Sequence, residues 1–277
     1  MNYAALHRHA QVTLSRSAVA HNVAAIKNHA HAQQVMAVLK ANAFSHGLPE
    51  MAMLSSQSGA TRFGVAMLDE ALALRDLGYQ QPIDVLGLTD PQFVRLAAQR
   101  DITLAFSSLA TIQQAAKVLA DTSLHLKVSL PVDTGLNRIG FKERDQLVLA
   151  IQEVVDSKQL EFQSLWTHFA TADTPNETYV DFQISEWQRL TQNLPAQPKE
   201  QHFANTGIAT WYADKVDTDI IRLGVGLFGI DSSEPTMPMP FELEPVLELT
   251  AEVIFSKPIK AGEAVGYGAD YRAKHDG

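Results

Sequence analysis

The sequence predicts an α/β protein: a TIM (β/α)8 barrel followed by the start of an all-β C-terminal domain. Between residues 15 and 230, eight short runs of β-branched and aliphatic residues alternate with longer helix-like stretches, as in βα units around a parallel sheet. Eight such pairs favour a barrel over a doubly wound sheet. With 46% hydrophobic and 19% charged residues, the 277-residue chain can bury a sizeable core.

The first predicted element is a helix that begins at Ser15 or Ser17, since either serine can serve as its N-cap. Val19, Val23 and Ile26 follow at helical spacing and predict its buried face. A second helix is predicted over 69–77, where acidic residues open the first turn. The eight predicted strands cover residues 34–40, 62–66, 82–87, 102–106, 124–132, 162–169, 202–205 and 219–224.

The segments outside the barrel differ from it in composition. Residues 231–240, DSSEPTMPMP, have the Pro-rich, polar composition of a linker. The residues after them alternate like strands, but up to Gly277 they supply about three strands, too few to bury both faces of a sheet. We therefore predict a segment 1–14 that can add a strand to the β domain, a barrel over 15–230, and a linker with an incomplete β domain over 231–277. Either the N-terminal segment and a partner chain complete the β domain, or the chain is cut short.

Composition excludes several classes of protein. The net charge of -9 argues against a broad phosphate-backbone footprint, so we expect no nucleic-acid partner. The absence of cysteine excludes disulfides and a catalytic thiol, and the scattered histidines favour no metal site. No apolar run has the length of a signal peptide or of a bilayer span, so we expect a soluble cytoplasmic protein without a membrane partner.

Candidate functional residues follow from the fold, because the active site of a TIM barrel lies at the C-terminal ends of its strands. Lys40 either marks where a strand meets solvent or is a Schiff-base lysine, mounted rigidly and buried at the barrel mouth. His168 is a core histidine or a site residue. The other candidates are Arg138 in the loop DTGLNR, suited to a carboxylate, Asn205 with Thr206, and Arg222 with the phosphate-binding type of turn at Gly224.

Seven motifs support the functional alternative. They resemble, in sequence and in order, motifs of the alanine racemase family of fold-type III pyridoxal-phosphate enzymes, and they extend over almost the whole chain. The motifs are AVLKANAFSHG (37–47), VAMLDEALALR (65–75), DTGLNRIGF (133–141), THFATAD (167–173), HFANT (202–206), IRLGVGLFG (221–229) and VGYGADY (265–271).

The resemblance implies pyridoxal 5'-phosphate as the cofactor, with Lys40 as the residue that binds it covalently. It also implies Lys40 and Tyr267 as two catalytic bases. Racemisation removes a proton from one face of Cα and delivers one to the other, which two flanking groups accomplish. In the family the tyrosine reaches the site from the second subunit, so a homodimer with shared active sites is implied.

The same resemblance gives roles to the other candidates. Arg222 would contact the pyridine nitrogen of the cofactor and, being protonated, keep that nitrogen unprotonated. His168 would bridge Arg222 and Tyr267, and Arg138 would bind the substrate carboxylate. The remaining implied cofactor contacts are Asn205 beside the ring, and Thr206, Gly224 and Val225 at the phosphate.

The chain departs from the family pattern at three places. Phe44 replaces a tyrosine whose hydroxyl contacts the phosphate, which predicts weaker cofactor binding. Pro131 stands where many members have a carbamylated lysine. The nearest lysine, Lys127, lies four residues earlier on the strand, a distance of roughly 13 Å. Arg138 therefore needs another partner. The β domain ends before further gate and phosphate contacts, so we expect this chain to be inactive or unstable by itself.

These observations predict pyridoxal-phosphate-dependent interconversion of L-alanine and D-alanine, which supplies D-alanine for peptidoglycan. One alternative is a racemase for another small amino acid, such as serine, because pocket size does not follow from these motifs. Another is a non-catalytic cofactor-binding barrel. Tyr267 argues against the barrel-only protein, which has no use for the β-domain segment VGYGADY.

Overall fold

The computed structural model describes residues 7, 9–233 and 235–277. Within them, eight parallel strands form one sheet in the order β8-β7-β6-β5-β4-β3-β2-β9, so neighbours in sequence are neighbours in the sheet except at its ends. All eight predicted strands are present, most of them a few residues shorter than predicted. They are β2 (Gln34–Val38), β3 (Arg62–Val65), β4 (Ile83–Leu88), β5 (Ile102–Ala105), β6 (Leu126–Pro131), β7 (Leu160–Trp166), β8 (Glu200–His202) and β9 (Ile220–Leu223).

The two end strands meet and bring the sheet close to a closed barrel. An isolated parallel bridge joins Asn205, just after β8, to Arg222 on β9. The Arg222 backbone N–H donates to the carbonyl of Ala204 at 2.8 Å. This arrangement confirms the predicted TIM-type barrel.

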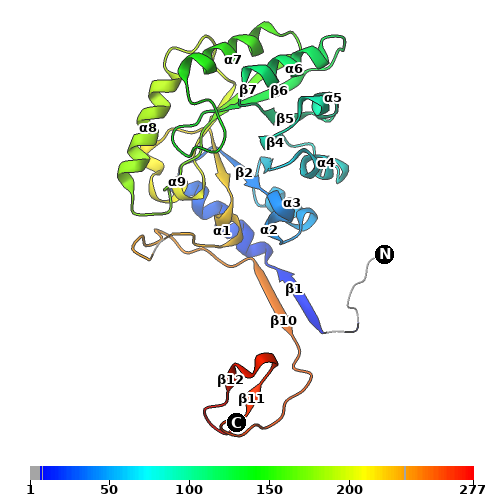
Figure 1. The fold of residues 1–277 in the computed structure, drawn as a ribbon, viewed down its shortest axis with the longest axis vertical. Helices are drawn as coiled ribbons and strands as arrows, with labels where there is room; N and C mark the ends of the chain where they lie inside the picture. The colour runs from blue at the N-terminus through cyan, green and yellow to red at the C-terminus, as the bar shows by residue number, and fades with distance from the viewer. Residues whose placement is uncertain (1–6, 8, 234) are drawn as a thin grey trace. The chain divides into compact units, whose positions relative to one another are not determined.

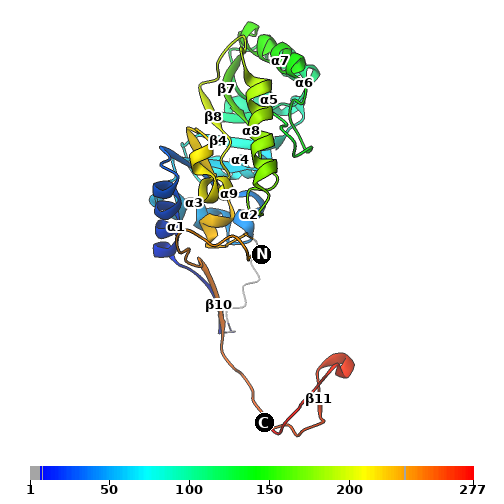
Figure 2. The same cartoon turned by 90° about the vertical axis from the view of Figure 1, so that its left-hand side faces the viewer.

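Helices surround the strands, as Figures 1 and 2 show from two directions. The first, α1 (Arg16–His29), begins after Ser15, whose hydroxyl accepts the Ala18 N–H at 3.1 Å. It buries Val19, Val23 and Ile26, as predicted. The others are α3 (Leu48–Gln57), α4 (Leu68–Asp76), α5 (Val94–Gln99), α6 (Leu109–Leu119), α7 (Arg144–Asp156), α8 (Glu177–Thr191) and α9 (Thr206–Trp211), with 3-10 turns η1 (Pro91–Phe93), η2 (Ala213–Lys215) and η3 (Val225–Phe228).

One short segment has an uncommon backbone. The element α2 (Lys40–Phe44) is a left-handed turn: Ala41, Asn42, Ala43 and Phe44 have φ between 51° and 54°, and Ser45 has φ 67°. Left-handed conformation costs a non-glycine residue about 1–2 kcal/mol, so surrounding contacts must hold this turn. Because the turn follows directly, β2 ends at Val38, earlier than the predicted end at Lys40.

Contacts along the chain define two compact units. The larger comprises Leu14–Leu247, and the smaller joins the described residues before Leu14 to Glu248–Gly277. In the smaller unit, β1 (Ala10–Leu14) pairs with β10 (Leu247–Ala251), and β11 (Ala264–Val265) pairs antiparallel with β12 (Tyr271–Arg272). Most of the predicted segment 1–14 before Ala10 lies outside the described residues.

The proline-rich segment after the barrel packs on the larger unit. Trp211 donates its indole N–H to the Pro238 carbonyl at 3.2 Å, and the Phe241 ring lies 5.1 Å from the His29 ring. Asn22 on α1 accepts the Glu244 N–H at 2.8 Å. Residues up to Leu247 therefore belong to the larger unit by contacts, while the domain limits predicted from the sequence stay a prediction.

Among the described residues, no helix combines the length and the apolar character that a membrane crossing requires. The described part of the chain also contains no group of three or more His, Cys, Asp or Glu side chains placed to hold a metal ion.

Candidate active site

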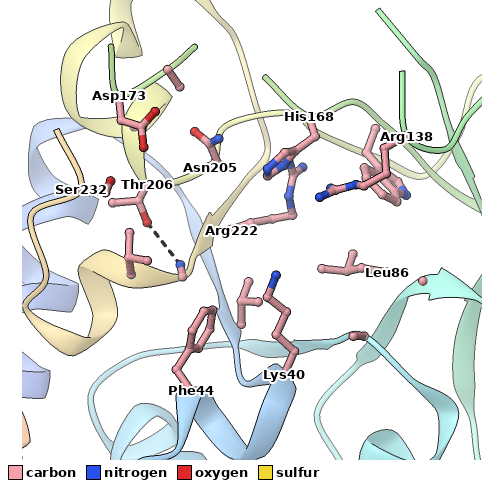
Figure 3. A pocket seen from close by; sticks show the side chains of 18 of the residues that line it. Lys40, Phe44, Leu86, Arg138, His168, Asp173, Asn205, Thr206, Arg222 and Ser232 are labelled. Atoms are coloured by element: carbon pink, nitrogen blue, oxygen red, sulfur yellow. Dashed lines mark hydrogen bonds between the residues drawn. The ribbon is translucent and has the colours of Figure 1, made fainter. Parts of the chain in front are cut away.

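A cavity of about 460 Å³ lies in the larger unit, lined by residues at and after the C-terminal ends of the strands. This volume is typical of ligand-binding pockets. Figure 3 shows the side chains of Lys40, Arg138, His168 and Arg222 around one space. Every candidate from the barrel lines this cavity: Lys40, Arg138, His168, Asn205, Thr206, Arg222, Gly224 and Val225.

The backbone beside Lys40 is held by a carboxylate from the next βα unit. Glu70 on α4 accepts the Ala41 N–H at 2.6 Å, and its other oxygen accepts the N–H groups of Ala66 and Met67 at 2.8 and 3.1 Å. These charge-assisted bonds tie the left-handed turn to the end of β3. The turn directs Lys40 into the cavity and places its Nζ 5.5 Å from the Phe44 ring centroid. Lys40 is exposed there, not buried as expected from the sequence.

Arg222 is the most enclosed cation of the site, with 3% exposure. Its Nη1 donates to Nδ1 of His202 at 3.0 Å, and its Nη2 donates to the Thr167 carbonyl at 2.7 Å and approaches Nδ1 of His168 at 3.2 Å. These acceptors are uncharged. Burial, and next the positive charge of Arg138, lower the pKa of Arg222 to about 9. No hydrogen-bond acceptor for Nε is present among the described residues, so this N–H remains for a ligand.

Two histidines beside Arg222 are neutral at physiological pH. Burial, together with the positive charges of Arg222, Arg138 and Lys40, lowers the pKa of His168 to about 3. Burial, then Arg222 and Arg62, lowers the pKa of His202 as well. Each imidazole can therefore accept a hydrogen bond from the guanidinium through Nδ1.

Thr206 and the turn after β9 form the opposite end of the cavity (Figure 3). The N–H groups of Gly224 and Gly226 donate to the Thr206 hydroxyl at 3.2 and 3.4 Å. Asn205 caps α9, because its side-chain oxygen accepts the Ile208 N–H at 2.9 Å. A hydroxyl beside backbone N–H groups suits an anion such as a phosphate.

Arg138 extends into the cavity from the loop after β6 (Figure 3). No hydrogen bond or ion pair joins its guanidinium to the rest of the described chain. Pro131 ends β6, and Lys127 forms an ion pair with Asp101 at 2.6 Å, so Lys127 is occupied elsewhere. The partner that the sequence left open for Arg138 is thus not Lys127.

Tyr267 belongs to the smaller unit, whereas all residues that line the cavity belong to the larger one. It lies in the 3-10 turn η4 (Tyr267–Ala269) between β11 and β12, and its side chain is fully exposed. Its role as a second base stays a prediction.

Sequence reasoning missed three side chains that support the site. Glu70 lies in the quoted motif VAMLDEALALR, and His202 opens HFANT, but neither was given a role. Trp166 precedes THFATAD at the end of β7 and lines the cavity. The position of Trp166 and His202 at strand ends was the available signal for both.

Comparison with known proteins agrees with this geometry. Residues 14–232 match the family described as alanine racemase, N-terminal domain. Alanine racemase of Levilactobacillus brevis is 39% identical over 97% of this chain and 73% of its own length. Two solved structures are also similar.

The histidine racemase of Leuconostoc mesenteroides subsp. sake is 70% identical, with a TM-score of 0.95 over 100% of this chain and 74% of that one. The alanine racemase of Bacillus anthracis with bound L-Ala-P is 32% identical, with a TM-score of 0.88 over 99% and 72%. The sequence match over most of the chain and the barrel fold lead to one conclusion: the chain belongs to the alanine racemase family of amino-acid isomerases.

Proposed function

We propose that this chain contains the cofactor-binding barrel of a pyridoxal-5'-phosphate-dependent amino-acid racemase whose preferred substrate is histidine. The observation that carries the reaction class is that a lysine amine, a buried arginine without a carboxylate partner and a phosphate-type turn line one cavity. These groups fit the cofactor at its aldehyde, pyridine nitrogen and phosphate. Arg222 lines the cavity, and its hydrogen bonds to the protein leave Nε available to contact the ring.

Four parts of the chain would hold the cofactor. Lys40 would bind it covalently, Arg222 would donate a hydrogen bond to the pyridine nitrogen, and Asn205 would support the ring. Thr206 and the backbone at Gly224 and Val225 would hold the phosphate. When bound, pyridoxal phosphate supplies an electron sink for the pair of electrons left at Cα.

Two bases on opposite faces of Cα then move the proton. Nζ of Lys40 removes or returns it on one face, and Oη of Tyr267 from a second copy of the chain acts on the other. His168, which approaches Arg222 at 3.2 Å, would bridge Arg222 and this tyrosine in its neutral form, which its low pKa supports. The proposal therefore requires a homodimer.

Arg222 limits what the bound cofactor can do. A guanidinium that donates Nε–H leaves the pyridine nitrogen unprotonated, so the ring withdraws electrons less strongly. Proton return at Cα then competes well with transamination. Arg138, which has no protein partner among the described residues, binds the substrate carboxylate.

Histidine is preferred as the substrate because the 70% identity to a histidine racemase extends over the whole chain, whereas the alanine racemase relatives named above share 32–39%. Alanine is the second candidate, supported by those relatives. In that case the enzyme supplies D-alanine for peptidoglycan in the cytoplasm.

The test is chiral chromatography of the full chain loaded with pyridoxal phosphate and given L-histidine, L-alanine or L-serine. D-histidine should form with a kcat/KM at least about tenfold above that for alanine, a discrimination that side-chain contacts in one pocket can supply. The reverse ranking would overturn the substrate assignment and leave the reaction class intact.

Lys40→Ala and Tyr267→Phe separate cofactor binding from catalysis. Lys40→Ala should lose the visible absorbance band of the lysine-bound cofactor. Tyr267→Phe should keep the band but lose about 10²–10⁴-fold in turnover, the usual contribution of one acid–base group. A wild-type chain with the band and no turnover of any amino acid would instead support the non-catalytic barrel.

A further inference from the structure

Among the described residues, Trp166 is the one aromatic side chain within cation–π distance of the Arg222 guanidinium. The Cζ atom of Arg222 is 5.4 Å from the centroid of the Trp166 ring. Trp166 is 3% exposed, and it also lines the cavity. A cation over an indole face is attracted by the ring quadrupole, more strongly when both groups are desolvated.

The indole is held in this orientation by two neighbouring strands. Its Nε1–H donates to the Ser129 hydroxyl on β6 at 2.8 Å, and Ser129 is itself buried. On β8, the His202 ring stacks on the indole at 5.9 Å with an interplanar angle of 13°. Trp166 and His202 are register partners in the β7–β8 ladder. The Trp166 ring therefore has little freedom to turn away from Arg222.

Arg222 needs such a neighbour because no carboxylate contacts it. The charged and titratable groups that face it are His168 after β7, His202 on β8, Arg138 from the loop after β6 and, at longer range, Asp84 on β4. Two of these are neutral imidazoles and one is a like charge, which leaves a buried cation without a direct counter-ion.

We propose that Trp166 is a positioning residue for Arg222: its indole face takes the place of a carboxylate and keeps the guanidinium charged and aimed at the cofactor nitrogen. The role of this contact in aiming Arg222 at the cofactor rests on the proposed function. The contact between the two side chains exists without the cofactor, so it can be tested separately.

The first test uses the ligand-free full chain. Nuclear magnetic resonance of the Arg222 Nε–H group, in protein labelled with 15N-arginine, measures the rate of hydrogen exchange. Trp166→Leu should raise this rate about tenfold, a size that fits a desolvated cation–π contact, while Trp166→Phe should raise it about threefold because a ring face remains. Trp211→Phe is the matched control: it also loses an indole N–H bond, to Pro238, without touching Arg222.

Unchanged exchange in Trp166→Leu with a wild-type circular dichroism spectrum would overturn the proposal. If Trp166→Leu does not fold, the test compares Trp166→Phe with Trp211→Phe, and equal exchange rates in those two variants would overturn the proposal. Ser129→Ala removes the acceptor of the indole N–H but keeps the ring, so its exchange rate should lie between those of the wild type and Trp166→Leu.

The second test uses the chain loaded with pyridoxal phosphate. The alkaline fall of racemase activity, and of the cofactor absorbance band with pH, should move down by about one pH unit in Trp166→Leu and return most of the way in Trp166→Phe. If Trp166 acts only in packing, Trp166→Leu should lower the activity and the absorbance band at every pH without shifting the pH at which they fall. Failure of every variant, including wild type, to bind the cofactor would sink the proposed function but leave the exchange result standing.

Discussion

Two buried arginines lie at the same level of the barrel on the two strands that flank β2, and they are held in opposite ways. Arg62 on β3 and Arg222 on β9 are both Cα partners of Met36 on β2, and they are 1% and 3% exposed. Arg62 donates to Asp84 through Nε and Nη2 at 3.0 and 2.8 Å, and it also forms an ion pair with Glu200. Arg222 has only neutral acceptors and an aromatic face.

The pKa values of the two guanidinium groups diverge accordingly. Burial lowers the pKa of Arg62, but Asp84 and Glu200 outweigh burial and raise it above its ordinary value. For Arg222, burial prevails and the pKa falls to about 9. A buried arginine whose charge is already satisfied by carboxylates serves the fold. Arg222 lacks carboxylate partners and lines the cavity, and this difference supports the proposal that Arg222, and not Arg62, contacts a ligand.

The largest expected effect is on the stability of the fold. Arg62→Met strands Asp84 without its partner inside the barrel, and removing one member of a buried ion pair costs about 3–5 kcal/mol. Arg222→Met strands no carboxylate and should cost clearly less. Guanidinium chloride unfolding followed by circular dichroism measures both. Equal losses in the free energy of unfolding for the two variants would contradict the difference between the two arginines.

The next effect concerns activity. Arg222→Lys keeps a positive charge but loses the planar fork, so the contacts with His202, Thr167 and the cofactor cannot all form. Turnover should fall about 100-fold, the scale of one positioned electrostatic group. Arg62→Lys is the matched control and should change turnover little in whatever fraction is folded. Activity near wild type in Arg222→Lys would show that Arg222 acts only as a charge.

A smaller effect appears in the dependence of stability on pH. His168 and His202 are neutral when folded, with pKa values lowered by burial and by nearby cations. The unfolded state takes up a proton near pH 6.5, so stability should fall as pH drops below this value, by about 1.4 kcal/mol per pH unit for each histidine. For His168 the fall continues towards its folded pKa of about 3. Unfolding at pH 7 and pH 5 should show a shallower fall in His202→Gln than in the wild-type chain.

The smallest effect is expected at the outer end of the Arg62 cluster. Glu200 is a half-buried partner with a second donor, Gln163, at 3.0 Å. Glu200→Gln leaves Asp84 on Arg62, so the loss should be about 1 kcal/mol, as for one hydrogen bond. A loss as large as that of Arg62→Met would place the principal partner of Arg62 at Glu200 instead of Asp84.

The repetition of strand and helix patterns was enough to predict the barrel, because each βα unit contains its own apolar strand and amphipathic helix. Strand ends were less predictable. The run QVMAVLK is apolar up to Lys40, but the chain turns left-handed from Ala41, held there by Glu70 from the next βα unit. No local pattern in KANAFS indicates this turn, since none of its residues is glycine.

Candidate site residues at strand ends could be predicted from position and motif, whereas the side chains that hold them in place could not. Lys40, Arg222 and Thr206 were predicted at strand ends, and all three line the cavity. The contacts of Trp166 with Ser129, His202 and Arg222 come from four different strands, and such contacts exist only after the barrel has formed. Sequence could not show either that Arg138 has no partner among the described residues, because Pro131 indicates only that the lysine of many family members is missing there.

The bridge between Asn205 and Arg222 has a consequence for how the protein folds. The other neighbouring strands of the barrel are paired through ladders of two or more residues, whereas β8 and β9 meet through an isolated bridge between two residues that line the cavity. A structure opens preferentially where its contacts are fewest, so local unfolding should begin at this seam. Any ligand that binds both Arg222 and Thr206 then stabilises the closed barrel, by an amount that grows with the logarithm of ligand concentration over its Kd, so ligand binding and barrel closure are thermodynamically coupled.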